Sequence, residues 1–351
     1  ARQVDWLSRQ TVRVAMLLFT WLAWPWFAGA QEPAPPLEKP MVAWTIGLPA
    51  FDRVSYRICL ARLLAQYEKK AEISLVPDRF DVIGLKVQTA NAPGLCTPRF
   101  LVDGVIDLLL RRGFRIDNIF LLDLQAHGMR AAGFLPPLSV GGSGYREVPV
   151  KALVGGDHFR TDWFHESPLP PSPDHAVQVR LKHPGDLDAQ RREGRRSYLP
   201  TPLMLGKVGW INLPVAKDSA SLGVDCAVSN ASLWNVGNHR RFLDRKSTAP
   251  AAAIEILAVP ELWERHLFTV LSLEKFQYSG GRSFQAAYLA SRPTLLLSPN
   301  PIAIDSVVLD LVREEREKHG LLERSKDQLL FQYARSLKLG DAKEAKIEPV
   351  R

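Results

Sequence analysis

The feature that most constrains the fold is a strand–helix–strand unit in the first third of the chain. An apolar run over Val82–Val87 predicts a strand, and the amphipathic segment Phe100–Arg112, followed by Gly113, predicts a helix. Asn118–Asp123 then predicts a second strand. Strands joined through a helix run parallel with a right-handed crossover, so a chain that contains this unit belongs to the α/β class.

Further elements extend this pattern. The sequence predicts strands at Met41–Ile46, Glu147–Leu153, Ala176–Leu181, Val208–Leu213, Ile254–Val259 and Thr269–Leu273, and helices at Arg53–Lys70, Pro301–His319 and Lys326–Leu337. Glycine, proline and charged residues break the pattern at about 125–207, which predicts an irregular inserted lid or subdomain. We therefore expect one α/β domain over 41–340, with a mostly parallel or mixed open sheet, flanking helices and a strand-end ligand crevice, followed by a polar tail at 341–351.

Two helices are expected to open with a polar residue and a proline directly after a strand. In the first, Thr97 is the expected cap and Pro98 the first helical residue; in the second, Asn300 and Pro301 follow the apolar Thr294–Leu297. Helix N-termini present unpaired amide hydrogens and the positive end of the helix dipole. We expect the two N-termini to lie at neighbouring strand ends and to line one crevice that suits an anionic group.

The beginning of the chain has the pattern of an export signal. Three arginines within residues 1–13 precede the uncharged Val14–Ala30, which ends in the small-x-small pattern Ala-Gly-Ala. This predicts a secretory signal peptide at 1–30, a Pro-rich spacer at 31–40, and a periplasmic or other extracytoplasmic location. An uncleaved anchor at 14–30 stays open as the alternative, since this stretch approaches spanning length and holds three tryptophans; the protein would then meet a membrane only through its N-terminus.

The cysteine count and the charge exclude several kinds of site. Cys59, Cys96 and Cys226 form no C-x-x-C pair, so no iron–sulfur cluster is expected, while one disulfide or free buried thiols both stay open. Cys96 precedes the expected cap, where a helix N-terminus can lower the pKa of a thiol. The net charge of +8 is concentrated in the arginines of 191–196, but no aromatic residues are interleaved there. We therefore expect a solvated loop and no nucleic-acid partner.

Several short motifs occur in an order that resembles a known family. Gly84–Gln88 is similar to an apolar-Lys-x-Asn element, and Thr97–Pro98 to a T-x-P helix start. Ile211–Lys217 is similar to an I-N-L-P-x-x-K segment, Gly223–Asn230 to a G-x-x-x-x-x-K-N stretch, and Asn300–Asp305 to a D-P-x-A-x-D motif. Together they resemble the domain of unknown function numbered 362, found in bacterial and archaeal proteins.

This resemblance implies the fold and the crevice better than any chemistry, because the family has no agreed general activity. Some of its members carry ferredoxin-like cysteine motifs, which this chain lacks. The chain also departs from the family pattern at Gln88, Ser229 and Asn300, where Asn, Lys and Asp are usual. Whether these departures mean lost or altered activity stays open.

The candidate site residues lie where an open α/β sheet places its ligands, beyond the carboxyl ends of strands. We predict Lys86 and Lys217 as cations, Asp123 and Asp305 as acid–base or metal-binding carboxylates, and Thr97, Asn212, Asn230 and Asn300 as ligand-binding residues. A lysine inside an apolar strand is expected to be buried and paired. A structural ion pair of Lys86 with one of the two aspartates is therefore the alternative interpretation.

Two further groups give weaker signals. His158, Asp162 and His165 offer mixed nitrogen and oxygen donors for a divalent metal, but their spacing matches no metal motif and is typical of solvated surface. His239, beside two arginines, is a candidate general acid or base, although an exposed loop position is favoured. The absence of G-x-S-x-G, H-E-x-x-H and P-loop motifs argues against a serine hydrolase, a zinc peptidase or a nucleoside triphosphatase.

These observations predict an exported α/β protein that binds an anionic small molecule or a cell-envelope fragment. Catalysis by the lysine and aspartate residues stays open, as do the reaction and any cofactor. The alternative is a non-catalytic structural or interaction protein of the cell envelope.

Overall fold

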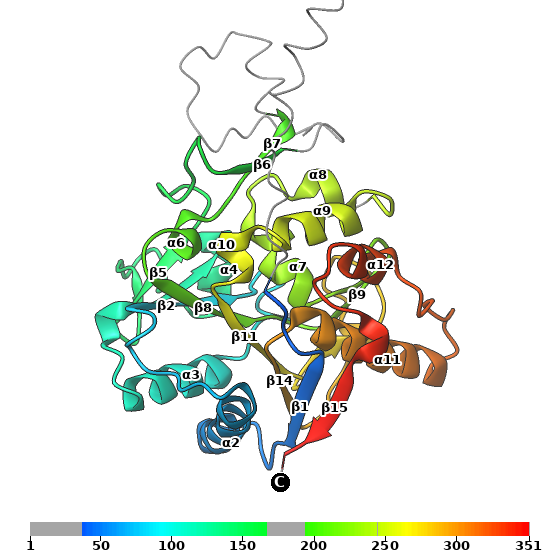
Figure 1. The fold of residues 1–351 in the computed structure, drawn as a ribbon, viewed down its shortest axis with the longest axis horizontal. Helices are drawn as coiled ribbons and strands as arrows, with labels where there is room; N and C mark the ends of the chain where they lie inside the picture. Colours follow the sequence, from blue (N-terminus) through cyan, green and yellow to red (C-terminus); the bar gives the residue numbers. More distant parts are fainter. Residues whose placement is uncertain (1–36, 167–193, 244, 351) are drawn as a thin grey trace, which may run out of the picture. The chain divides into compact units, whose positions relative to one another are not determined.

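Nine strands of the described residues form one sheet with helices on both faces (Figure 1). The computed structural model describes residues 37–166, 194–243 and 245–350, which belong to one compact unit. The strand order is β15-β1-β14-β11-β8-β2-β3-β5-β4. The predicted fold class, α/β with a mixed sheet and flanking helices, is confirmed.

The strands of the main sheet are β1 (Val42–Gly47), β2 (Val82–Val87), β3 (Ile119–Asp123), β4 (Gly144–Tyr145), β5 (Val148–Ala152), β8 (Val208–Leu213), β11 (His266–Ser272), β14 (Thr294–Ser298) and β15 (Lys346–Pro349). The smaller sheets contain β9 (Lys217–Ser219), β10 (Gly223–Asp225), β12 (Phe276–Gln277) and β13 (Leu289–Ala290), and β6 (Phe164–Glu166) with β7 (Arg196–Tyr198). The helices are α2 (Arg53–Ala71), α3 (Arg99–Arg111), α4 (Ala126–Ala131), α6 (Thr201–Met204), α7 (Ala227–Ala231), α8 (Arg240–Leu243), α9 (Ala249–Leu257), α10 (Pro260–Trp263), α11 (Pro301–Lys318) and α12 (Leu329–Ser336). Short 3-10 turns lie at Ile116–Asn118, Leu233–Asn235, Ala286–Tyr288 and Ala342–Glu344.

The central strands are parallel and one strand runs against them. β11, β8, β2, β3 and β5 pair in parallel, as the predicted strand–helix–strand unit requires. β14 is antiparallel to both β11 and β1, so its carboxyl end lies at the opposite edge of the sheet from the carboxyl end of β2. β15 adds a parallel edge strand to β1.

Successive side chains of β2 point to opposite faces of the sheet. Ile83, Leu85 and Val87 belong to the apolar core that α2 and α3 cover, where Asp52 caps α2 by accepting from the Ser55 amide at 2.8 Å. Lys86 therefore points to the other face, where α7, α9, α11 and α12 pack (Figure 1). The buried polar network around Lys86 therefore lies on the face beneath α7 and α11.

Two segments differ from the sequence prediction. Ile254–Val259 was expected to form a strand, but Ala249–Leu257 forms α9, because alanines and a proline near its start favour a helix. Residues 341–351 were expected to form a polar tail, whereas Lys346–Pro349 forms β15. Its side chains are mostly exposed at the sheet edge, so this strand has no hydrophobic signature in the sequence.

Several predictions fall wholly or partly outside the described residues. The signal peptide or anchor at 1–30, residues 31–36 of the spacer and the strand at Ala176–Leu181 belong there. Of the predicted insertion at 125–207, β5 joins the main sheet beside β3, while β6 and β7 form a separate two-stranded antiparallel sheet. Among the helices of the described ranges, none combines the length and apolar character needed to cross a membrane.

Gly340 tests how tightly the C-terminal segment packs against β1 and α11. Its φ of +147° is a conformation that side chains rarely adopt, and an added Cβ would meet Met41 and lie 2.9 Å from Asn300 Nδ2. We expect Gly340→Ala to lower the free energy of unfolding by about 2–4 kcal/mol in urea denaturation, from strain plus overpacking. Gly320→Ala, at φ +64° with open space around it, should cost about 1–2 kcal/mol; equal costs would contradict the packing argument.

Candidate functional site

Lys86 is the centre of a buried polar network. Its side chain is 0% exposed, and Nζ donates to Asp123 Oδ1 at 2.7 Å, Asn230 Oδ1 at 2.9 Å and the Val87 carbonyl at 2.9 Å. An ammonium group has three hydrogens, and each of them has an acceptor here. Burial lowers the pKa of Lys86, while the Asp123 carboxylate opposes that shift. The predicted alternative, an ion pair of Lys86 with an aspartate, is what the structure contains.

The Asp123 carboxylate is also fully engaged. Oδ2 accepts from the Thr89 amide at 2.7 Å and from Thr89 Oγ1 at 2.6 Å, and Oδ1 accepts from the Leu124 amide at 2.8 Å. With 4% of the residue exposed, a ligand could contact either charge of the pair only by displacing these partners. The pair therefore joins the ends of β2 and β3 rather than facing an open crevice.

The network continues across β8 and β11. In the sheet register Lys86 is level with Asn212, and Asn212 with Thr269. Asn230 of α7 donates from Nδ2 to Asn212 Oδ1 at 2.8 Å, and Asn212 donates from Nδ2 to Thr269 Oγ1 at 3.2 Å and to the Ala227 carbonyl at 2.9 Å. Asn212 and Asn230 thus hold α7 on the sheet and satisfy each other.

A β-bulge in β11 brings His266 next to the buried network, and His266 connects the network to Lys39, a half-buried lysine that was not among the predicted site residues. The register shifts between His266 and Phe268, so His266 lies on the same face as Thr269 despite their odd separation. His266 Nε2 lies 3.1 Å from Thr269 Oγ1, and its Nδ1 lies 3.2 Å from Lys39 Nζ. Lys39 Nζ also donates to the His266 carbonyl at 2.5 Å. A chain of polar contacts therefore runs from Lys39 to the Lys86–Asp123 pair.

Asp305 caps a helix instead of facing solvent. From α11, its Oδ1 accepts from the Ala227 amide at 2.6 Å and its Oδ2 from the Val228 amide at 3.1 Å, at the start of α7. Burial, together with the nearby charge of Asp225, raises the pKa of Asp305 to about 8, although the two amides act in the opposite direction. The Asp305 carboxyl is thus mostly protonated at neutral pH.

Lys217 belongs to a second buried ion pair. Its Nζ lies 3.1 Å from Asp225 Oδ2 and donates to Asn91 Oδ1 and to the Arg282 carbonyl, both at 3.1 Å. Burial alone would raise the pKa of Asp225, but Lys217 and a hydrogen bond from Ser229 outweigh it and lower that pKa. Lys217, like Lys86, is therefore occupied by groups of the protein itself.

The two expected helix openings do not meet. Asn300 caps α11 as predicted, with Oδ1 accepting from the Ile302 amide at 2.9 Å. Thr97 does not cap α3: Pro98 holds the cap position, and Thr97 Oγ1 instead accepts from the Gln88 amide and donates to the Leu213 carbonyl. Because β11 and β8 separate β14 from β2 and β14 runs antiparallel, the prediction of neighbouring strand ends was wrong.

The weaker candidates are also placed differently from their predictions. The cysteines are free, and burial raises the pKa of Cys96 rather than lowering it. His239 is buried, not exposed, and burial lowers its pKa to about 4. Asp162 pairs with Arg160 and His165 with Glu255, and the described ranges hold no group of three or more His, Cys, Asp or Glu side chains arranged for a metal.

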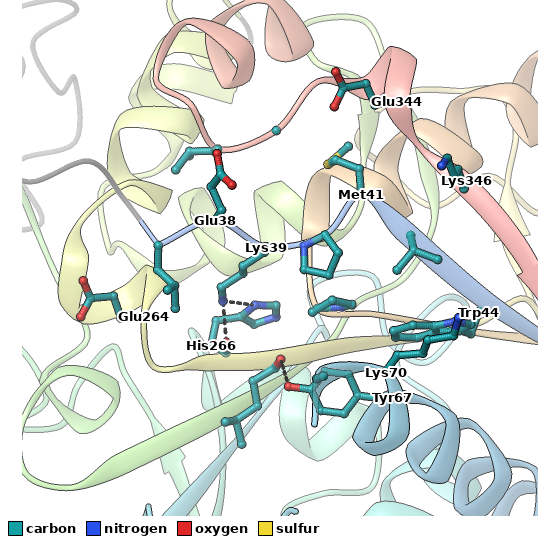
Figure 2. A pocket seen from close by; sticks show the side chains of 18 of the residues that line it. Glu38, Lys39, Met41, Trp44, Tyr67, Lys70, Glu264, His266, Glu344 and Lys346 are labelled. Carbon is teal, nitrogen blue, oxygen red and sulfur yellow. Dashed lines mark hydrogen bonds between the residues drawn. The ribbon is translucent and has the colours of Figure 1, made fainter. Parts of the chain in front are cut away.

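A large open pocket lies at the Lys39 end of the polar chain. We call it the Lys39 pocket; its volume is about 1070 Å³, and it is lined by Lys39, Trp44, Tyr67, Lys70, Arg79, His266 and parts of the segments 37–42 and 338–348. Figure 2 shows the Lys39 side chain directed at the His266 ring, with the Tyr67 hydroxyl bonded to the Leu267 carbonyl below it. Asn300 fixes the pocket wall, since its Nδ2 donates to the carbonyls of Lys39 at 3.2 Å and Leu339 at 2.8 Å.

The amine of Lys39 is less basic in this pocket than an ordinary lysine amine. Burial, followed by the charge of Arg79, lowers the pKa of Lys39 to about 7, against an opposing effect of Glu264. Nζ also lies 4.6 Å from the centre of the Trp263 ring. Among the described residues, no carboxylate lies within ion-pair distance of Lys39. The sequence analysis did not predict Lys39 as a site residue because it falls in the Pro-rich stretch that was interpreted as a spacer.

Loss of one partner of the Lys86–Asp123 pair should strongly lower the free energy of unfolding. We expect Lys86→Met to lower the free energy of unfolding by about 3–5 kcal/mol, because it leaves the Asp123 charge buried without its cation. Lys86→Met with Asp123→Asn removes both charges and should recover part of that loss in chemical denaturation. A cost below about 1 kcal/mol for the single variant would show that Asp123 is solvated.

Asp305 should make stability fall with rising pH. Its pKa is 3.8 in the unfolded reference and about 8 in the folded protein, so the native state binds more protons between these values. The stabilisation is complete below about pH 4 and is lost as the pH rises through 8. In urea denaturation from pH 4 to 9, Asp305→Asn should flatten this dependence, whereas Asp310→Asn, exposed on the same helix, should not; an unchanged profile in Asp305→Asn would contradict the assignment.

Comparison of the chain with known proteins found no matching family model, no matching curated protein and no matching solved structure. The resemblance to the family of domain of unknown function 362 therefore stays a prediction from the motifs.

Proposed function

We propose that this protein binds an anionic small molecule in the Lys39 pocket. The observation that carries the proposal is a half-buried amine on the pocket wall whose nearest partners are a backbone carbonyl and an imidazole, not a carboxylate. A cationic group that lacks an acidic partner gains most from an anion supplied by a ligand.

The surroundings of Lys39 support a ligand of mixed character. Lys70 and Arg79 line the same pocket and also have no carboxylate within ion-pair distance in the described part of the chain. Leu37, Met41 and Val42 add partly exposed apolar surface. Trp44 and Tyr67, labelled in Figure 2, are only 2% and 5% exposed and offer little surface to a ligand. A volume of about 1070 Å³ lies near the upper end of the range that is typical of small-molecule sites. The lining carries many charges of both signs, and the acidic Glu38, Glu264, Glu344 and Glu348 favour a small anion over a highly charged one.

Export of the protein and membership of the resembled family remain part of the proposal. The motifs at Gly84–Gln88, Ile211–Lys217 and Asn300–Asp305 supply most of the buried network, so the resemblance bears on the scaffold of the site. An extracytoplasmic location would give the pocket access to envelope-derived acids.

A non-catalytic structural or interaction protein of the cell envelope is the second candidate. It is favoured by one observation: Lys86, Asp123, Asn212 and Asn230 saturate one another and are buried. Under this alternative the polar set specifies the packing of α7 on the sheet, and small anions do not stabilise the fold.

Thermal denaturation of the full chain with glycolate, citrate and inorganic phosphate separates the two candidates. A bound anion at a hundred times its dissociation constant should raise the free energy of unfolding by about 2.7 kcal/mol. Lys70→Met should reduce the shift, and Lys69→Met, an exposed neighbour that does not line the pocket, should retain it. A flat response to all three anions supports the structural alternative, and an unchanged shift in Lys70→Met places the anion elsewhere.

A further inference from the structure

We infer that the Lys39 amine forms a reversible imine with the aldehyde or ketone carbonyl of an acidic ligand in the Lys39 pocket. This inference rests on the proposed function and adds the ligand class, an oxo acid. It assigns to Lys39 a covalent role that simple ion pairing does not require.

The position of the amine is the first support. Three contacts hold Nζ at the pocket wall: the His266 carbonyl at 2.5 Å, His266 Nδ1 at 3.2 Å and the face of the Trp263 ring at 4.6 Å. A reacting group fixed in this way loses little freedom when it meets a ligand. The pocket in front of it is open and large enough for a ligand with several carbon atoms.

The protonation state of the amine is the second support. The charged groups that face Lys39 are Arg79, which disfavours the ammonium form, and Glu264, which favours it; His266, whose own pKa is well below its usual value, stays neutral. With a pKa of about 7, about half of the Lys39 side chains carry a free lone pair at neutral pH, whereas an ordinary lysine has far less than 1%. Desolvation beside another cation is how proteins activate lysine as a nucleophile.

The reaction balances without any oxidant or metal. The Nζ lone pair attacks the carbonyl carbon, a C–N bond forms, and the carbonyl π electrons move to oxygen. A proton passes from nitrogen to that oxygen to give a carbinolamine. The hydroxyl then takes up a proton and leaves as water while the C=N bond forms, and the iminium nitrogen returns a proton to the solvent, so that no net proton is consumed. Water addition reverses the sequence and releases the carbonyl compound and the amine.

The ligand class follows from the other lining residues. Lys70 and Arg79 share the pocket with Lys39, so a carboxylate on the ligand can be bound while its carbonyl reaches Nζ. Leu37, Met41 and Val42, which are exposed or partly exposed in the lining, offer apolar surface for the carbon skeleton of the ligand.

Reductive trapping tests the inference on the full chain. The protein is incubated at pH 7 with glyoxylate and sodium cyanoborohydride, and the carboxymethyl adducts are located by peptide mass spectrometry. We expect Lys39 to be modified at least about tenfold faster than the exposed Lys69, because far more of it is neutral. Equal modification of the two lysines overturns the inference.

A charge-retaining variant and a non-carbonyl acid distinguish this result from simple anion binding. Lys39→Arg forms no reducible imine, so the adduct at position 39 should disappear, whereas Lys69→Arg, at an exposed position outside the pocket, should leave that adduct unchanged. If glycolate stabilises the wild-type chain but glyoxylate shows no preference for Lys39, the imine is wrong and the proposed function stands. If Lys39 is trapped selectively but glycolate, citrate and phosphate do not shift the melting temperature, the imine is supported and the proposed binding of simple anions is wrong.

Discussion

The burial of one ammonium group, that of Lys86, determines much of the rest of this structure. A charge placed inside a strand that is covered on both sides is tolerated only when every hydrogen of the group has an acceptor. Asp123 from β3, Asn230 from α7 and a carbonyl of β2 itself supply these acceptors. The short helix α7 must therefore lie directly over β2 and β8, where Asp305 and Asn212 hold its first turn. The need to satisfy one charge thus fixes the packing of three separate stretches of the chain.

This arrangement also shows how far the sequence could predict the fold and the site. β2 and β8 were predictable at their observed bounds because apolar runs between loop signals specify buried parallel strands. The burial of Lys86 was predictable for the same reason. The antiparallel direction of β14 was not, because strand order and direction depend on long-range pairing that leaves no local pattern. This is why Thr97 and Asn300, similar as helix openings in the sequence, lie at opposite edges of the sheet and cannot share a crevice.

The Lys39 pocket could not be predicted from the sequence, also for a physical reason. Lys39 is separated from His266 by 227 positions, and neither residue stands in a recognisable motif. The contact depends on the β11 bulge, which places His266 on the same face as Thr269. Part of the pocket lining comes from β15, whose exposed side chains resemble a tail in the sequence. Sites built from an edge strand, a bulge and the entry segment of a domain therefore carry little local signal, even when their chemistry is distinctive.

Asn300 both caps α11 and holds the wall of the Lys39 pocket. The resembled motif has an aspartate at this position, and either residue can cap α11 by accepting from the Ile302 amide. An aspartate has no hydrogen to offer, however, whereas the Asn300 amide donates to the carbonyls of Lys39 and Leu339, on two stretches that line the Lys39 pocket. Asn300 thus ties the pocket wall to the sheet through two donated hydrogen bonds, which an ionised aspartate at this position could not make.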